Sequence, residues 1–146
     1  MGTQTLVIVA LSNIHQVVSL KLTNINYLYW QMQMKRYLLG QGVFHFVNGS
    51  ITCPSSHVFD SSAGSSFTIN PSFLCWKQQD QLNLSVLLSS LSVDVLHLVV
   101  DCHTLYCVWR TLEKALASLS NSRIMQLHGS FQDLRQGDSS VSIYMQ

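Results

Sequence analysis

Charged residues are scarce in this chain of 146 residues. Its 8 Lys+Arg and 7 Asp+Glu make up 10% of the sequence, against about 25% in a typical soluble domain. Lys35 and Arg36 are the only adjacent cations, so the basic cluster that neutralises phosphates in nucleic-acid-binding proteins is missing. Apolar residues nevertheless reach 47% and the net charge is +1, which excludes disorder of the whole chain. Weak repulsion between copies favours self-association or poor solubility.

Paired cysteines are also lacking. None of Cys53, Cys75, Cys102 and Cys107 forms a C-x-x-C motif, and we interpret all four as free thiols in a reducing, cytoplasmic compartment. Cys102 and Cys107 with His103 offer three zinc ligands, but no fourth lies nearby. Cysteines that pack between helices are therefore expected, with neither a metal site nor a cofactor.

The patterns that catalysis requires do not occur. Glu113 is the only glutamate and the six aspartates are scattered, so paired carboxylates for acid–base chemistry are absent. The sequence has no G-x-S-x-G elbow, no H-E-x-x-H motif and no glycine-rich phosphate loop. We expect no catalytic residue and no cofactor-binding or small-molecule site, although an unrelated small enzyme stays open as a remote alternative.

Long apolar runs are missing as well. The run from Leu6 to Leu11 is too short for a membrane span or a signal peptide, and no positive residue precedes it. Leu6 also stands where myristoylation requires Ser or Thr. We expect no membrane association, and we predict that residues 1–16 form a poorly ordered or extended N-terminus.

Helical periodicity dominates the rest of the chain. Alternation over 17–22 predicts a short extended segment, and the stretch 23–26 offers cap oxygens before a helix that ends near Gly40. A short helix is expected at 43–47, followed by a Ser/Gly-rich loop of about twenty residues near 50–72. Pro71 heads the next helix, and Ser92 caps a short one.

The C-terminal third predicts three further helices. Thr104 caps the first, Ser120 and Asn121 interrupt it and start the second, and Gly137 ends the second. Asp138 then begins a helix that stops within about two turns, which indicates a domain truncated at its C-terminus. The prediction is one all-α domain of five or six helices over residues 17–146.

Large apolar residues on the helical stripes are the candidate core anchors of this domain. They are Tyr27, Trp30, Trp76, Leu88, Leu91, Val108, Trp109, Leu112, Leu127 and Leu134. The three tryptophans could in principle stack on nucleic-acid bases, but no basic residues are interleaved with them. We therefore assign them to the core.

Several stretches in a fixed order resemble one known family. They are Lys21-Leu22-Thr23 with Asn26-Tyr27 and Trp30, the run Gly42 to Ser50, Trp76 with Gln79-Asp80-Gln81, the run Leu87 to Ser92, the run Val108 to Glu113, Met125-Gln126-Leu127, and Leu134 to Ser142 with Tyr144. Together they resemble the N-terminal Gag region of plant copia-type LTR retrotransposon polyproteins, from about Val17 to the end of the chain.

The resemblance implies a helical capsid-like subunit that associates with other Gag copies into virus-like particles and has no catalytic role. In the family, further capsid helices and an RNA-contacting zinc knuckle follow the S-V-x-x-Y position. No residue of this chain matches that knuckle, so we carry over neither zinc nor direct nucleic-acid binding. The alternative is a host-domesticated helical domain that binds another protein through an apolar groove.

Overall fold

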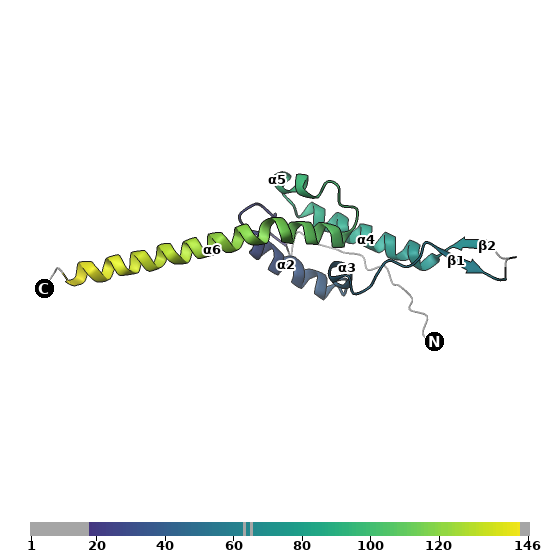
Figure 1. Ribbon diagram of the computed structural model, residues 1–146, viewed down its shortest axis with the longest axis horizontal. Helices are drawn as coiled ribbons and strands as arrows, with labels where there is room; N and C mark the ends of the chain where they lie inside the picture. Colours follow the sequence, from purple (N-terminus) through teal and green to yellow (C-terminus); the bar gives the residue numbers. More distant parts are fainter. Residues whose placement is uncertain (1–17, 63, 65, 144–146) are drawn as a thin grey trace.

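The computed structural model describes residues 18–62, 64 and 66–143, and the fold class is confirmed as mostly helical (Figure 1). The predicted N-terminal segment, residues 1–16, lies outside this described part. The elements in order are α2 (Tyr27–Gly40), α3 (His45–Asn48), β1 (His57–Asp60), β2 (Ser66–Ile69), α4 (Pro71–Ser89), α5 (Val93–Leu96), the 3-10 helix η1 (His97–Val99) and α6 (Leu105–Ile143).

A polar turn sets the start of α2. The Asn26 side chain accepts a hydrogen bond from the Thr23 backbone at 2.8 Å and donates one to the Lys21 carbonyl at 2.9 Å. This bracing leads the chain from the extended segment into the helix. Leu22 in that segment forms a parallel bridge with Leu91, so the chain before α2 is tied to the end of α4.

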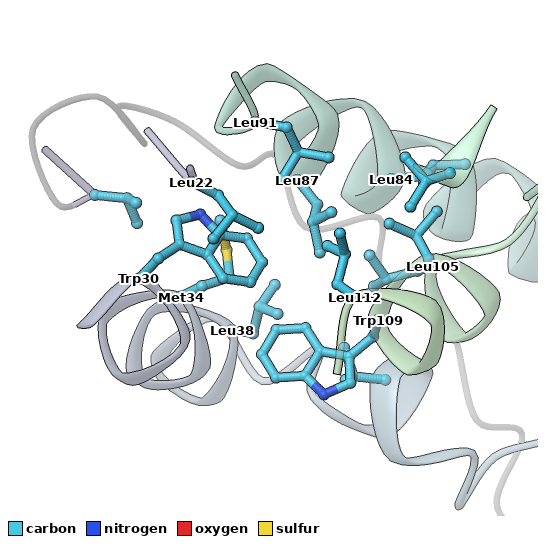
Figure 2. Packing of buried hydrophobic residues seen from close by; sticks show 14 of the residues in the cluster. Leu22, Trp30, Met34, Leu38, Leu84, Leu87, Leu91, Leu105, Trp109 and Leu112 are labelled. Atoms are coloured by element: carbon cyan, nitrogen blue, oxygen red, sulfur yellow. The ribbon is translucent and has the colours of Figure 1, made fainter. Parts of the chain in front are cut away.

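Three helices enclose the core. The buried face of α2 meets α4 and the first half of α6, and Figure 2 shows Trp30, Leu87 and Trp109 converging from these three helices. The rings of Trp30 and Trp109 lie 5.8 Å apart, and Trp30 Nε1 donates to Ser90 Oγ at 3.0 Å. The indole nitrogen is therefore satisfied inside an apolar core, as burial of tryptophan requires.

The predicted loop at 50–72 is wrong in one respect, because it contains an antiparallel hairpin. Strand β1 pairs with β2, and Phe59 lies opposite Phe67 with ring centroids 5.6 Å apart. Cross-strand aromatic pairs stabilise a hairpin, and Gly64, with φ 74°, supplies a turn conformation that other residues adopt at a cost. Each strand has only four residues, which is too short for a clear alternating pattern.

The three helices predicted after Thr104 are a single helix, α6, so the expected breaks at Ser120 and Gly137 do not occur. Two other serines of α6 satisfy their hydroxyls within the helix. Ser122 Oγ donates to the Ser118 carbonyl at 3.1 Å, and Ser130 Oγ donates to the Gln126 carbonyl at 3.0 Å. A helix also tolerates an internal glycine such as Gly137, at a cost of about 1 kcal/mol.

Candidate assembly surface

Helix α6 has a buried inner half and an exposed outer half. Leu105, Val108 and Leu112 are fully buried and Leu116 nearly so. Beyond Ser120, all residues as far as 137 are exposed except Gly129, which is half-buried. Residues 121–143 extend the helix by about 34 Å at 1.5 Å per residue. Figure 1 shows most of this outer half projecting from the body, beyond the start of α2.

Four apolar side chains form a line along the outer half. Ile124, Leu127, Phe131 and Leu134 follow one another at spacings of three, four and three residues, and their exposed fractions are 40%, 60%, 69% and 70%. We call them the α6 stripe. This spacing places them on one face and matches the seam of a pair of packed helices. The stripe therefore suits contact with a second helix.

A groove continues the stripe toward the body of the molecule. It has a volume of about 250 Å³ and lies between the start of α2 and the middle of α6. Its lining residues are Ile25, Leu28, Tyr29, Ser120, Arg123, Ile124 and Leu127. Ser120 is 5% exposed, and its hydroxyl has no hydrogen-bond partner in the described part of the chain. The stripe and this α2–α6 groove thus form one continuous, largely apolar surface.

Two acceptors hold the N-terminus of α6, and one of them, Asp80, ties it to α4. Thr104 Oγ1 accepts from the Cys107 backbone at 3.2 Å, which confirms the predicted cap. Asp80 Oδ1, from α4, accepts from the Leu105 backbone at 3.1 Å. A carboxylate also interacts favourably with the positive end of the helix dipole. These bonds set the direction in which α6 leaves the body, and so the position of the stripe.

Asp80 makes the stability of this junction depend on pH. Burial raises the pKa of its carboxyl above the usual value, and the hydrogen bonds from Leu105 and Gln81 oppose part of that rise. A raised pKa in the folded state means that the Asp80 contribution is fully present below the unfolded pKa and is lost as pH rises through the folded pKa. We therefore expect wild type to gain stability relative to Asp80→Asn as the pH falls from neutrality through the folded pKa of Asp80 toward its unfolded pKa.

Urea denaturation at a series of pH values measures this difference. Asp80→Ala is the companion variant, because it leaves the Leu105 N–H without its acceptor and should cost about 1–3 kcal/mol. Stability profiles of wild type and Asp80→Asn that run parallel over the whole pH series would contradict the assignment.

The structure places the ten predicted anchors in three environments. Tyr27, Trp30, Leu91, Val108, Trp109 and Leu112 are buried, while Trp76 and Leu88 are partly buried against the core. Leu127 and Leu134 require a correction, because they lie on the exposed α6 stripe and not in the core of the described fold. Helical spacing identified their face correctly, but no described element covers it.

Sequence reasoning missed the buried polar residues of α4. Gln79, Asp80 and Asn83 are at most 3% exposed, and Gln79 Nε2 donates to Asn83 Oδ1 at 3.0 Å. Hydropathy gives no signal for such residues. The sequence pattern was interpreted as placing Asp80 and Asn83 mostly off the apolar face of this helix, which the structure corrects. Asp80 lies one turn from both Trp76 and Leu84, so helical spacing does carry a signal for its burial.

Two features that other functions would require are absent from the described residues. No group of three or more His, Cys, Asp or Glu side chains that could hold a metal ion was found among them. Likewise, none of their helices is long and apolar enough to cross a membrane.

Comparison with known proteins identifies the class of the chain. Residues 15–55 match the family model described as the Gag-polypeptide of LTR copia-type. The chain is 32% identical over 126 residues to the retrovirus-related Pol polyprotein from transposon RE1 of Arabidopsis thaliana, which covers 86% of this chain and 8% of the relative. It is 31% identical over 107 residues to the corresponding RE2 polyprotein of the same plant, which covers 73% and 7%.

These matches identify the chain as a retrotransposon Gag sequence. More particularly, the chain belongs to the copia-type Gag family in its plant form, and the resemblance noted in the sequence is confirmed. It spans less than a tenth of the length of the two polyproteins. No solved structure matches it.

Proposed function

We propose that this chain is a structural, non-catalytic Gag subunit that associates with other copies of itself in a capsid-like assembly. The observation that carries this proposal is the outer half of α6, which presents the α6 stripe to solvent far from the core. The family supports it, because a Gag region is a structural part of a polyprotein. Residues 17–146 act in this proposal as one Gag-like domain in the cytoplasm.

The energetics of the stripe favour association. Full burial of a Leu, Ile or Phe side chain contributes about 1.5–3 kcal/mol, and four such side chains are available on one helix face. Charge opposes contact only weakly, since Arg123, Asp133 and Arg135 are the charged residues between 121 and 137. Two copies can therefore approach with little electrostatic repulsion.

Sedimentation velocity over a concentration series tests the proposal. A self-associating subunit should show a monomer at the lowest concentrations and dimers or larger species as the concentration rises. A chain that stays monomeric at the highest concentration would contradict self-association.

The second candidate is the host-domesticated interaction domain. The α2–α6 groove favours it, because an apolar cavity of about 250 Å³ suits the side chains of another protein. Genomic sequence beyond the codon for Gln146 separates the two. A continuing frame that encodes a zinc knuckle, protease and integrase supports the Gag subunit, whereas an independently expressed gene without them supports the host domain.

A further inference from the structure

Two thiols meet beside the N-terminus of α6. The Cys107 thiol donates a hydrogen bond to Cys102 Sγ, and the two sulfur atoms are 2.9 Å apart. Both cysteines are free and partly exposed. Their sequence spacing suggested only packing between helices, whereas the fold places the two sulfur atoms in direct contact.

The backbone holds both cysteines in place. The Cys102 N–H donates to the Val99 carbonyl at 3.0 Å, which closes the turn after η1. The Cys107 N–H donates to the Thr104 cap at 3.2 Å, within the first turn of α6. The Thr111 hydroxyl lies 3.4 Å from Cys102 Sγ on the next turn. The approach of the sulfurs therefore follows from anchored backbone on both sides.

We propose that Cys102 and Cys107 form a dithiol site that low-molecular-weight disulfides, such as oxidised glutathione, convert to an intrachain disulfide. A disulfide bond is about 2.05 Å long, so the sulfurs need to approach by about 0.9 Å from their present separation. Rotation of the two short side chains supplies a movement of this size. Access is also available, since both residues are partly exposed.

The exchange proceeds in two balanced steps. The Cys102 thiolate attacks one sulfur of oxidised glutathione, breaks its S–S bond and releases one glutathione, which takes up a proton. Cys107 then loses its proton, attacks Cys102 Sγ and releases the second glutathione. The two cysteines have lost two protons and two electrons, and one glutathione disulfide has become two thiols.

The hydrogen bond assigns the order of attack. Cys107 is the donor, and its contact with Cys102 raises the pKa of the Cys107 thiol, with partial burial as a second cause. Cys107 therefore keeps its proton to higher pH than an ordinary thiol, whereas Cys102 Sγ, the acceptor in this contact, is the sulfur that attacks first. The resulting bridge joins the turn after η1 to the first turn of α6, across the Thr104 cap.

The chain offers a direct readout of this bridge. Trypsin cleaves after Lys77 and Arg110, so one peptide, residues 78–110, contains both Cys102 and Cys107 and neither of the other two cysteines. The intact chain is equilibrated in buffers with a series of ratios of reduced to oxidised glutathione, quenched with acid, alkylated and digested. The mass of the peptide is then measured by mass spectrometry. We expect this peptide to lose two hydrogens and to resist alkylation, and added dithiothreitol should reverse both changes.

The same titration of the urea-unfolded chain separates the effect of the fold from that of sequence spacing. We expect the folded chain to close the bridge in glutathione buffers on the order of tenfold more reducing than the unfolded chain requires. Equal midpoints in the two states would overturn the proposal, because they would show that the fold does not favour the pair.

Serine variants provide the matched controls. Cys53→Ser with Cys75→Ser should leave the closure of peptide 78–110 unchanged. Cys107→Ser should instead accumulate glutathione on Cys102 as a stable mixed disulfide, because the second attack is lost. A wild-type chain that stops at mixed disulfides on peptide 78–110, with no loss of two hydrogens, would also overturn the proposal.

Discussion

Replacement of Trp109 by alanine is expected to lower the free energy of unfolding by about 3–5 kcal/mol. Trp109 of α6 is 6% exposed and packs against α2, with its ring centroid 5.8 Å from that of Trp30 and 6.3 Å from that of Phe44. Its removal leaves a cavity at the contact between these helices, and the aromatic contacts are lost with it. Equilibrium denaturation by urea, followed by circular dichroism, measures the change.

Trp76→Ala is the matched control for Trp109→Ala. Trp76 is only partly buried, packs on Phe46 at 5.5 Å, and has an indole nitrogen without a hydrogen-bond partner in the described part of the chain. Its removal should cost less than that of Trp109, because less apolar surface is lost from the core. Wild-type stability in Trp109→Ala would refute its place as a core anchor.

The double substitution Leu127→Asp with Phe131→Asp is expected to abolish self-association through the α6 stripe. Both side chains are mostly exposed in the single chain, at 60% and 69%. In the proposed assembly each would place an unpaired carboxylate in an apolar contact, which is strongly unfavourable. We expect the association constant to fall at least on the order of a hundredfold, or about 2.7 kcal/mol. Sedimentation velocity at matched concentrations gives the constants.

Met125→Asp is the control for the stripe. Met125 is 76% exposed on the same half of α6 but lies off the face that the stripe occupies. It should leave self-association unchanged, and both sets of substitutions should change the unfolding free energy by no more than about 0.5 kcal/mol. An equal loss of association in Met125→Asp would contradict a specific role for the stripe.

The sequence was most informative where a pattern is local. The spacing of Tyr27 and Trp30 located the buried face of α2, and Thr104 was identified as the cap of α6. Pro71 at the head of α4 was read from its preference for the first turn of a helix. In each case the deciding interaction lies within a few residues along the chain.

Local patterns misled where two outcomes had similar propensities. Ser120 and Gly137 are as compatible with a helix end as with a helix interior, and only the continuous structure of α6 shows that they are interior. The hairpin was missed because its stabilising contact, Phe59 against Phe67, joins residues on two separate four-residue segments.

By itself, the sequence determined the mostly helical class, the periodic faces of the main helices and the copia-type Gag family, because residue spacing and ordered motifs encode them directly. Only the tertiary structure decided which faces are covered. Leu112 and Leu127 share an apolar pattern on one helix, yet α2 and α4 enclose the first while no described element covers the second. Tertiary structure likewise brought Asp80 to the N-terminus of α6 and Cys102 to Cys107. Burial and contacts of this kind depend on packing between separate segments, and periodicity along the chain does not indicate which segments pack together.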